Sequence, residues 1–563
     1  MQQLIDLFQD PVDAQHHLNV DAFREYLHGH PTEQVDIMMI EEGYPLYAVE
    51  RGKQRLCKRA KNIVNNKREL HAILKRMVKE AKQGYIYPAS KQHLYCLNLL
   101  CVPKADKLTG LKTDIRVARH GSYCTRSTVS INDLIPKEHS TMDTLPNFTT
   151  YVRNLYNSEW VALRDLKDAF RQLLVRNEDR DFIYYSLFGM HWADRRVAYG
   201  VASAAACCQR FAMTLIWIIK HKLLPPELSR LTALTVHIDD FFIGTKTKAQ
   251  CDKVAQAFDN LCDELGVQVS HEKDETSIQK GVVHGIKFDV QARPKLVDMP
   301  LVKYLDLRQG IQLMIVYERA TGEALESVCG KIMHYSCYRK VSKVFCHRLI
   351  GFIHKHIRNN KRARTQVFDI PAEVLRDFGF YLQCFSSFKQ SSMEDILFSP
   401  SITITGSTDA SDVGGGFLIG GHWGSYLFRE EPNQYGVSHR HMSINYQEAH
   451  AVIMLLDNFK HVLTGRKLWL FIDNTSVLYS LYRYWAGSVT LMDYCHEIAL
   501  LLCKYHIQLR VDFIPTHMNV PADTLSRQKM DEFFAFVEEF NLMIDAEATP
   551  LTYYNELFLL NGA

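Results

Sequence analysis

The chain has 563 residues, of which 47% are hydrophobic and 23% charged, and its formal net charge is only +3. A chain of this length is too long to fold around a single hydrophobic core, and we expect about three to five structural units. The N-terminal residues lack a signal-sequence pattern and no apolar stretch is long enough to cross a bilayer. We therefore expect an intracellular protein, cytoplasmic or nuclear, without a membrane partner.

Residues 1–80 contain no catalytic signal and are predicted to form an N-terminal helical extension. The segment Arg51 to Arg76 holds ten Lys or Arg residues against one acid, Glu69, around a helical pattern. Because the net charge is nearly neutral, nucleic-acid binding would have to come from such local patches. A solvated helix face and a phosphate-contacting surface both fit this segment.

Residues 81–290 alternate apolar strand-like runs with helical patterns, which predicts a mixed α and β block. In VHIDDFFIG, residues 236–244, apolar residues flank Asp239 and Asp240, so the two acids fall where a hairpin would turn. Adjacent side chains of a strand face opposite ways, but at a turn both carboxylates can approach one divalent ion. Two acids alone would also suit a surface turn.

A second acidic segment strengthens the metal-site interpretation. In WVALRDLKDAFRQLLV, residues 160–175, an apolar strand-like run ends at Asp165 and a helix-like segment with Asp168 and Phe170 follows. Phosphoryl transfer uses two Mg²⁺ ions about 3.5–4 Å apart. Asp165 together with Asp239 and Asp240 could hold such a pair.

Residues 291–398 are predicted to be mainly helical. The stretch Lys331 to Arg364 is basic and carries interleaved aromatic side chains, which suits a surface that follows a nucleic-acid backbone; a charged outer face of a helical bundle is the alternative. The aromatic residues are Tyr335, Tyr338, Phe345 and Phe352. The spacing closest to a zinc site is His334, Cys337, Cys346 and His347, which we interpret as helix and core residues, with the cysteines as free thiols.

The last third of the chain contains four acids in distinct local contexts. Asp409 ends an alternating strand pattern, and Asp473 ends another. Glu448 lies on the same helical face as Ile444 and Val452, where an unpaired carboxylate would be costly unless it bound a metal. Asp523 precedes a helical pattern. The order predicts a metal nuclease in residues 399–530, before an acidic and aromatic tail, 531–563.

Several segments resemble, in order, the motifs of reverse transcriptases: DLKDAF, YGVASAAACCQRF, HIDDFF, and LGVQVSHEKDE followed by VVHGIKFD. Upstream, LLCVPKADKLTGLKTDIRVAR resembles the fingers segment that contacts the incoming triphosphate. The resemblance implies fingers and palm in residues 81–290 and a thumb with connection in residues 291–398.

Site residues follow from this resemblance. It implies that the metal ligands are Asp165, Asp239 and Asp240, with Lys273 as the general acid for pyrophosphate. Phe170 would exclude a ribose 2′-hydroxyl, and His237 stands at the primer end, where most of the family has Tyr. The remaining nucleotide and template contacts would be Lys104, Arg116, Asp168 through its backbone amide, Tyr199, Gly200 and Gln209.

The order strand acid, helix acid, strand-end acid, helix-start acid resembles RNase H, which implies that Asp409, Glu448, Asp473 and Asp523 bind metal and that His517 is its mobile histidine. The segments INYQEAHAV, FIDNTSVLYSL and FIPTHMNVPADTLSR are most similar to DIRS-type retrotransposons, with gypsy-type elements and pararetroviruses next. The segment VCGKIMHYSCYRKVSKVFCHRLIGFI also resembles the thumb of DIRS-type enzymes.

Together these features predict an α+β multidomain protein: a right-hand polymerase (fingers, palm, thumb) with a helical connection and a C-terminal RNase H-like α/β domain. Its expected activity is RNA-directed DNA synthesis and hydrolysis of the RNA strand of hybrids, for retroelement replication. We expect two Mg²⁺ ions per active site, with Mn²⁺ as a substitute, and as partners RNA template, DNA primer, RNA–DNA hybrid and dNTPs. The alternatives are a domesticated, catalytically silent nucleic-acid-binding protein and a polymerase that makes RNA.

Overall fold

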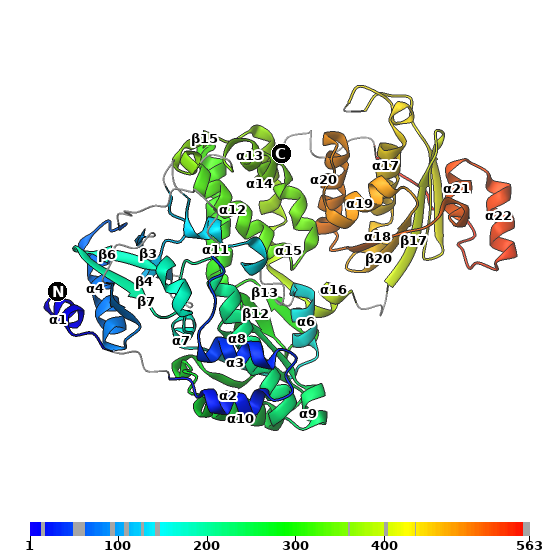
Figure 1. Ribbon diagram of the computed structural model, residues 1–563. Coiled ribbons are helices and arrows are strands. Elements are labelled where there is room, and N and C mark those ends of the chain that lie inside the picture. The colour runs from blue at the N-terminus through cyan, green and yellow to red at the C-terminus, as the bar shows by residue number, and fades with distance from the viewer. Residues whose placement is uncertain are drawn as a thin grey trace. The chain divides into compact units, whose positions relative to one another are not determined.

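The computed structural model describes residues 1–12, 17–48, 62–89, 96–105, 112–124, 129–140, 147–358, 361–398, 403–433 and 435–554 (Figure 1). The chain divides into two compact units, Met1–Lys295 and Leu296–Ala563. Across the described part of the chain, none of the helices combines the length and apolar character that a membrane span requires.

The first unit is built around an antiparallel sheet of order β10-β5-β9-β8. Its strands are β5 (Trp160–Asp165), β8 (Ala233–His237), β9 (Asp240–Thr245) and β10 (Glu275–Ile278). Helices α8 (Ala204–Ile218) and α10 (Lys248–Leu265) pack on it. A capping box of Thr247 and Gln250 starts α10, and Gly266, at φ +70°, ends it. This sheet fixes the ends of β5 and β8, where the acids lie.

A second group of strands in this unit carries the helix α4 (Lys67–Lys82). One sheet has the order β1-β7-β6-β2 and a separate hairpin joins β3 to β4. These strands are β1 (Ile86–Pro88), β2 (Cys96–Leu97), β3 (Leu99–Ala105), β4 (Lys112–Arg119), β6 (Tyr184–Leu187) and β7 (Met190–Asp194). Ile73 and Met77 of α4 are buried in a core with Leu99, Tyr185 and Trp192.

Short elements complete the first unit. The remaining helices are α1 (Gln2–Gln9), α2 (Val20–Leu27), α3 (Glu33–Glu41), α5 (Ile131–Leu134), α6 (Phe148–Tyr156), α7 (Ala169–Gln172) and α9 (Pro226–Leu231). A hairpin pairs β11 (Lys280–Val283) with β12 (Ile286–Asp289). The helix expected after Asp165 is only the single turn α7, because Leu173 returns to an extended conformation. The basic segment 51–61 lies outside the described residues.

The second unit begins with a mainly helical part, as predicted. It contains β13 (Leu296–Asp298), α11 (Leu301–Tyr317), β14 (Arg319–Thr321), α12 (Gly322–Tyr335), α13 (His347–His356), β15 (Val367–Asp369), α14 (Ala372–Gln383), α15 (Phe385–Lys389), β16 (Gln390–Ser392) and α16 (Met393–Leu397). Strand β13 pairs with β16 and β14 with β15.

The aromatic side chains expected on a nucleic-acid surface in this part are mostly core residues. Tyr335, Tyr338 and Phe345 are buried, and the Tyr338 hydroxyl donates to the carbonyl of Asp298. The fourth aromatic residue, Phe352 of α13, is partly exposed, so it remains with the basic residues as a candidate for backbone contacts. Of the four residues with the spacing closest to a zinc site, Cys346 is buried, Cys337 and His347 are partly buried, and His334 is exposed on α12.

The rest of the second unit is a five-stranded sheet of order β19-β18-β17-β20-β21, in which β17, β20 and β21 are parallel and β18 and β19 antiparallel. The strands are β17 (Thr403–Ala410), β18 (Gly414–Ile419), β19 (His422–Leu427), β20 (Lys467–Ile472) and β21 (Gln508–Phe513). The helices are α17 (Ile444–Asn458), α18 (Lys460–Leu463), α19 (Thr475–Arg483), α20 (Val489–Lys504), α21 (Val520–Ser526) and α22 (Met530–Glu539). Figure 1 shows α17 and α20 on one side of this sheet and α21 with α22 on the other.

The glycines after Asp409 lie in strand β18, where they allow close packing. A Cβ on Gly416 would lie 2.5 Å from the Cβ of Leu525 and 2.5 Å from the nitrogen of Ser526, both in α21. Only glycine permits this approach, which brings the helix carrying Asp523 against the strand carrying Asp409.

The tail beyond α22 folds back on this sheet. The nitrogens of Asp545 and Thr549 donate to the carbonyls of Gly421 and Trp423, at 3.0 Å each. Further along, the side chain of Asn458 in α17 exchanges hydrogen bonds with the backbone of Thr552. Residues 545–552 therefore belong to the packed structure of the second unit.

Candidate active sites

The predicted hairpin is present, and its turn consists of Ile238 and Asp239 between the paired residues His237 and Asp240. Ile238 has φ +61°, an unfavourable backbone for a β-branched residue, which costs about 1–3 kcal/mol. The buried amide of Gln209 compensates: its oxygen accepts from the nitrogen of Ile238 at 2.7 Å and its nitrogen donates to the carbonyl of Val236 at 3.2 Å. The side chain of Gln209, for which the resemblance implies a template-side position, therefore holds the turn in place.

The three acids of the first unit converge at this turn. Asp165 and Asp240 are directly opposite each other on β5 and β9, and the nitrogen of Leu166 donates to the carbonyl of Asp239 at 3.0 Å. Burial, followed by repulsion from Asp240 and Asp165, raises the pKa of Asp239 to about 6. Clustered, partly buried carboxylates that repel one another fit a divalent cation.

Lys273 also belongs to this group, because its Nζ lies 2.5 Å from Oδ1 of Asp165. Burial opposes its charge, but the hydrogen bond to Asp165 and the charges of Asp239 and Asp240 raise the pKa of Lys273 overall. The ammonium is therefore protonated at neutral pH and can serve as a proton donor.

Aromatic and small residues lie together beside the acids. The rings of Phe170 and Tyr199 have centroids 4.5 Å apart, and the Arg116 guanidinium lies 4.8 Å over the Tyr199 ring. Gly200, at φ +103°, permits contact with β4, since a Cβ there would lie 1.8 Å from the carbonyl oxygen of Arg119. Lys104 is in β3, and its side chain lies outside the described residues.

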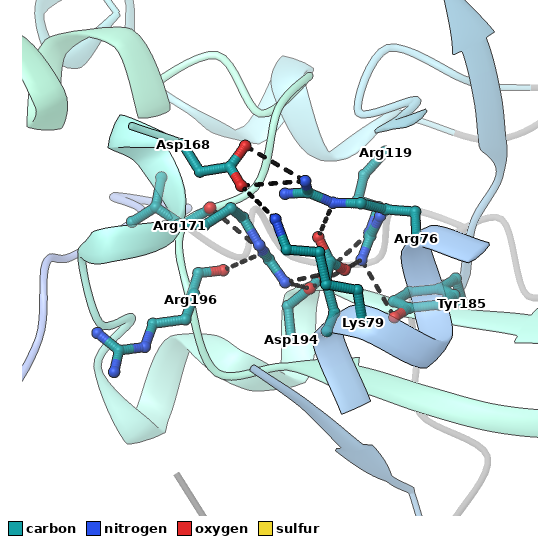
Figure 2. Close-up of polar contacts among 10 residues, drawn as sticks. Arg76, Lys79, Arg119, Asp168, Arg171, Tyr185, Asp194 and Arg196 are labelled. Carbon is teal, nitrogen blue, oxygen red and sulfur yellow. Dashed lines mark hydrogen bonds and ion pairs between the residues drawn. The ribbon is translucent and has the colours of Figure 1, made fainter. Parts of the chain in front are cut away.

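Two of the predicted contacts have unexpected neighbours. The ring of His237 lies 5.1 Å from that of His284, whose Nε2 is 3.3 Å from the carbonyl of Asp240. The carboxylate of Asp168 binds Arg76 and Lys79 of α4 (Figure 2). The sequence shows the basic run that ends at Arg76 but predicts neither cation as a partner of Asp168, because nothing local connects α4 with residue 168.

The acids of the second unit are brought together more tightly. Oxygens of Asp409, at the end of β17, Glu448, in α17, and Asp473, after β20, all lie within 4.8 Å of one another. Asp523 lines the same cavity and accepts a hydrogen bond from Nε of Arg527 at 2.8 Å. His517 is exposed in the turn Thr516–Met518, beside Thr516, which lines the cavity. Ile444, expected on the buried face of α17, is 46% exposed and lies at the cavity.

The electrostatics of this cluster favour a bound cation. Burial, despite a hydrogen bond from Ser526, and repulsion from Asp473 and Asp523 raise the pKa of Asp409 to about 7. Burial, then Asp409 and Asp473, raise the pKa of Glu448 well above its usual value. Among the described residues, no donor reaches Oε2 of Glu448. Oxygen ligands of this kind suit Mg²⁺ or Mn²⁺.

These shifts predict how stability depends on pH. Because the folded pKa of Asp409 exceeds its ordinary value of 3.8, the carboxyl stabilises the fold below that value and loses this contribution as the pH rises through about 7. The complete loss corresponds to about 4 kcal/mol. In metal-free buffer we expect Asp409→Asn to unfold at a higher temperature than the wild type, by a margin that grows from pH 5 to pH 8. Scanning calorimetry with EDTA measures this margin, and one that does not change with pH would contradict the assignment.

Comparison with known protein families gives a match for the segment that carries the first site. Residues 117–305 match the family model described as "Reverse transcriptase (RNA-dependent DNA polymerase)". Residues 117–305 are therefore similar to a reverse transcriptase domain, and the match includes Asp165, Asp239, Asp240 and Lys273. No curated protein sequence matches the chain.

Among solved structures, the chain is similar to foamy viral protease-reverse transcriptases, each 12% identical to it over 90% of its length. The complex with dsDNA has a TM-score of 0.46, and 99% of that protein is covered. A form called dRH, also with dsDNA, has a TM-score of 0.45 and 84% coverage. For the complex with RNA/DNA hybrid the TM-score is 0.45 and the chain spans 64% of that protein.

Proposed function

We propose that this chain is an RNA-directed DNA polymerase that also hydrolyses the RNA strand of RNA–DNA hybrids. The observation that carries the proposal is the presence of two separate carboxylate groups, one in each compact unit. The first group lies inside the reverse transcriptase match, and the second lies on a sheet whose order and acid positions suit RNase H.

At the polymerase site, Asp165, Asp239 and Asp240 would hold two Mg²⁺ ions, for which Mn²⁺ could substitute. When bound, these ions would activate the primer 3′-hydroxyl and neutralise charge on the triphosphate. Tyr199 and Gly200 would support the new base pair, with Arg116 and Lys104 at the phosphates. Lys273, protonated beside Asp165, would donate a proton to the pyrophosphate.

At the nuclease site, Asp409, Glu448, Asp473 and Asp523 would hold the ions. When bound, they would lower the pKa of the attacking water and stabilise charge on the RNA phosphate. The carboxylates would also hold this water for attack, and the exposed His517 would assist turnover. Cleavage would leave a 3′-hydroxyl.

The choice of deoxynucleotides depends on Phe170 in this proposal. Its ring, packed at 4.5 Å from Tyr199, would occupy the space that a ribose 2′-hydroxyl needs. We expect Phe170→Val to reduce discrimination against ribonucleotides by about 10- to 100-fold, the range that a few methylene groups supply in a shaped pocket. Single-nucleotide incorporation with dNTP and rNTP measures the ratio, and unchanged discrimination would assign Phe170 to the core.

The proposed substrates are an RNA template with a DNA primer, the RNA–DNA hybrid and dNTPs. We propose fingers and palm in residues 81–290, thumb and connection in 291–398, the nuclease in 399–530, and flanking segments 1–80 and 531–563. An RNA–DNA hybrid would be held by its backbone and shape, so binding should weaken steeply with salt.

Primer extension tests this proposal. An RNA template, a DNA primer, Mg²⁺ and either dNTPs or rNTPs should give product with dNTPs only. Product from rNTPs alone would favour an RNA-making polymerase. Absence of synthesis and of hybrid cleavage across a range of salt and metal, with hybrid binding intact, would favour a silent nucleic-acid-binding protein.

The motifs around the second acid group further favour an origin in DIRS-type retrotransposons, for replication of the element. A tyrosine recombinase gene beside the coding sequence would support this lineage. A neighbouring protease and integrase would instead indicate a gypsy-type element.

A further inference from the structure

The carboxylate of Asp168 holds two cations that come from a distant helix. Nη1 of Arg76 lies 3.2 Å from both of its oxygens, and Nζ of Lys79 lies 3.1 Å from one of them. Asp168 has a left-handed backbone, φ +48°, and is the third residue after Asp165. Figure 2 shows the three side chains converging from α4 and from the turn before α7.

This cluster lies at the nucleotide side of the polymerase site. Four charged groups act on the Tyr199 phenol, those of Arg116, Asp168, Asp239 and Arg76. Arg116 lies over the Tyr199 ring, so Arg76 and Asp168 share the surroundings of this ring with Arg116 and with Asp239 of the hairpin.

A buried network of ion pairs fixes the position of the Arg76 side chain. Its Nε binds Glu80 at 2.7 Å, and Arg119 binds both Glu80 and Asp194 at 2.9 Å. Arg171 binds Asp194 at 2.7 Å. Glu80 and Asp194 are almost fully buried, whereas the side chain of Asp168 is 32% exposed. Asp168 is therefore the one carboxylate of this network that a soluble anion can replace.

Charge also favours a second anion here. Arg76, Lys79, Arg119 and Arg171 face Asp168, Glu80 and Asp194, so the cations exceed the carboxylates by one. Without Asp168 the surplus would be two. A guanidinium beside an ammonium binds phosphate oxygens as readily as carboxylate oxygens.

We propose that Arg76 and Lys79 bind the phosphates of the incoming nucleoside triphosphate and that Asp168 occupies them when the nucleotide is absent. This inference rests on the proposed polymerase activity. Asp168 competes with the nucleotide, so removal of its charge strengthens nucleotide binding, while loss of Lys79 weakens it. If the ion pairs merely fastened α4 to the palm, both changes would loosen the same contact and act in the same direction.

The sign of the two effects is the test. On a saturating RNA template and DNA primer, we expect Lys79→Gln to raise the KM for dNTP about tenfold, the loss of one charge-assisted hydrogen bond, with kcat within about twofold. Asp168→Asn should lower this KM about threefold or more. Lys253→Gln, an exposed lysine of α10, is the matched control and should leave it unchanged. If Lys79→Gln and Asp168→Asn change the KM for dNTP in the same direction, or if neither changes it, the proposal is overturned.

Binding of inorganic tripolyphosphate, measured by calorimetry, separates this inference from the proposed activity. Asp168→Asn should bind it more tightly than the wild type, and Lys79→Gln more weakly, whether or not DNA is made. Identical affinities in the three proteins would overturn the inference even if the polymerase is active. If tripolyphosphate binds in the expected order of affinities but no primer is extended, the proposed activity is contradicted instead.

Discussion

We expect Asp239→Asn to lower the rate of DNA synthesis about 1,000-fold, because a metal ligand at the reacting phosphate supplies several kcal/mol and each 1.4 kcal/mol is a factor of ten. The substitution keeps the size of the side chain and the hairpin held by Gln209. Single-turnover extension of a DNA primer on RNA measures the loss. Hybrid cleavage should be unaffected, since its acids belong to the other compact unit.

Asp263→Asn is the matched control for this variant. Asp263 is an exposed acid of α10 in the same unit, so its loss removes one charge without touching the hairpin. A rate for Asp239→Asn within tenfold of this control would show that Asp239 does not hold the metal.

The second large effect is expected at Glu448. Glu448→Gln should lower cleavage of the RNA strand about 1,000-fold, since it removes a carboxylate from the cluster with Asp409 and Asp473. Because the ionised Glu448 is buried and repelled by Asp409, the neutral variant should also unfold at a higher temperature in EDTA. Cleavage of an end-labelled hybrid and calorimetry measure these two changes.

The control here is Glu539→Gln, an exposed acid at the end of α22. DNA synthesis by Glu448→Gln should match that of the control. Retained cleavage would show that the reaction does not need the Glu448 carboxylate. A loss of cleavage accompanied by a lower unfolding temperature would mean that Glu448 has a structural role.

Local patterns were enough to predict both acidic groups. The apolar residues around Asp239 and Asp240 predicted a hairpin, and the structure has one. Strand alternation before Asp409 and Asp473 and the helical spacing around Glu448 placed the acids on the elements that carry them. These features depend on residues a few positions apart, so the hydrophobic periodicity and the residue types typical of turns are enough to predict them.

Interactions between distant segments could not be predicted in this way. Asp168 and Arg76 are separated by 92 residues, and Gln209 binds a turn residue, Ile238, 29 residues away. Gly416 lies in strand β18, and its lack of a side chain admits α21, which is far from it in the sequence. The aromatic residues around Tyr338 looked suitable for a nucleic-acid surface, yet only tertiary packing decides which side chains of a basic segment are buried.

The central claim, that one chain copies RNA and then cuts it, is tested most directly with a doubly labelled substrate. The RNA template and the DNA primer carry different labels, and both products are followed in one reaction with dNTPs and Mg²⁺. The wild type should extend the primer and shorten the RNA, Asp239→Asn should only shorten the RNA of a preformed hybrid, and Glu448→Gln should only extend the primer. If one substitution abolishes both activities, or the wild type shows neither, the account of two independent sites is contradicted.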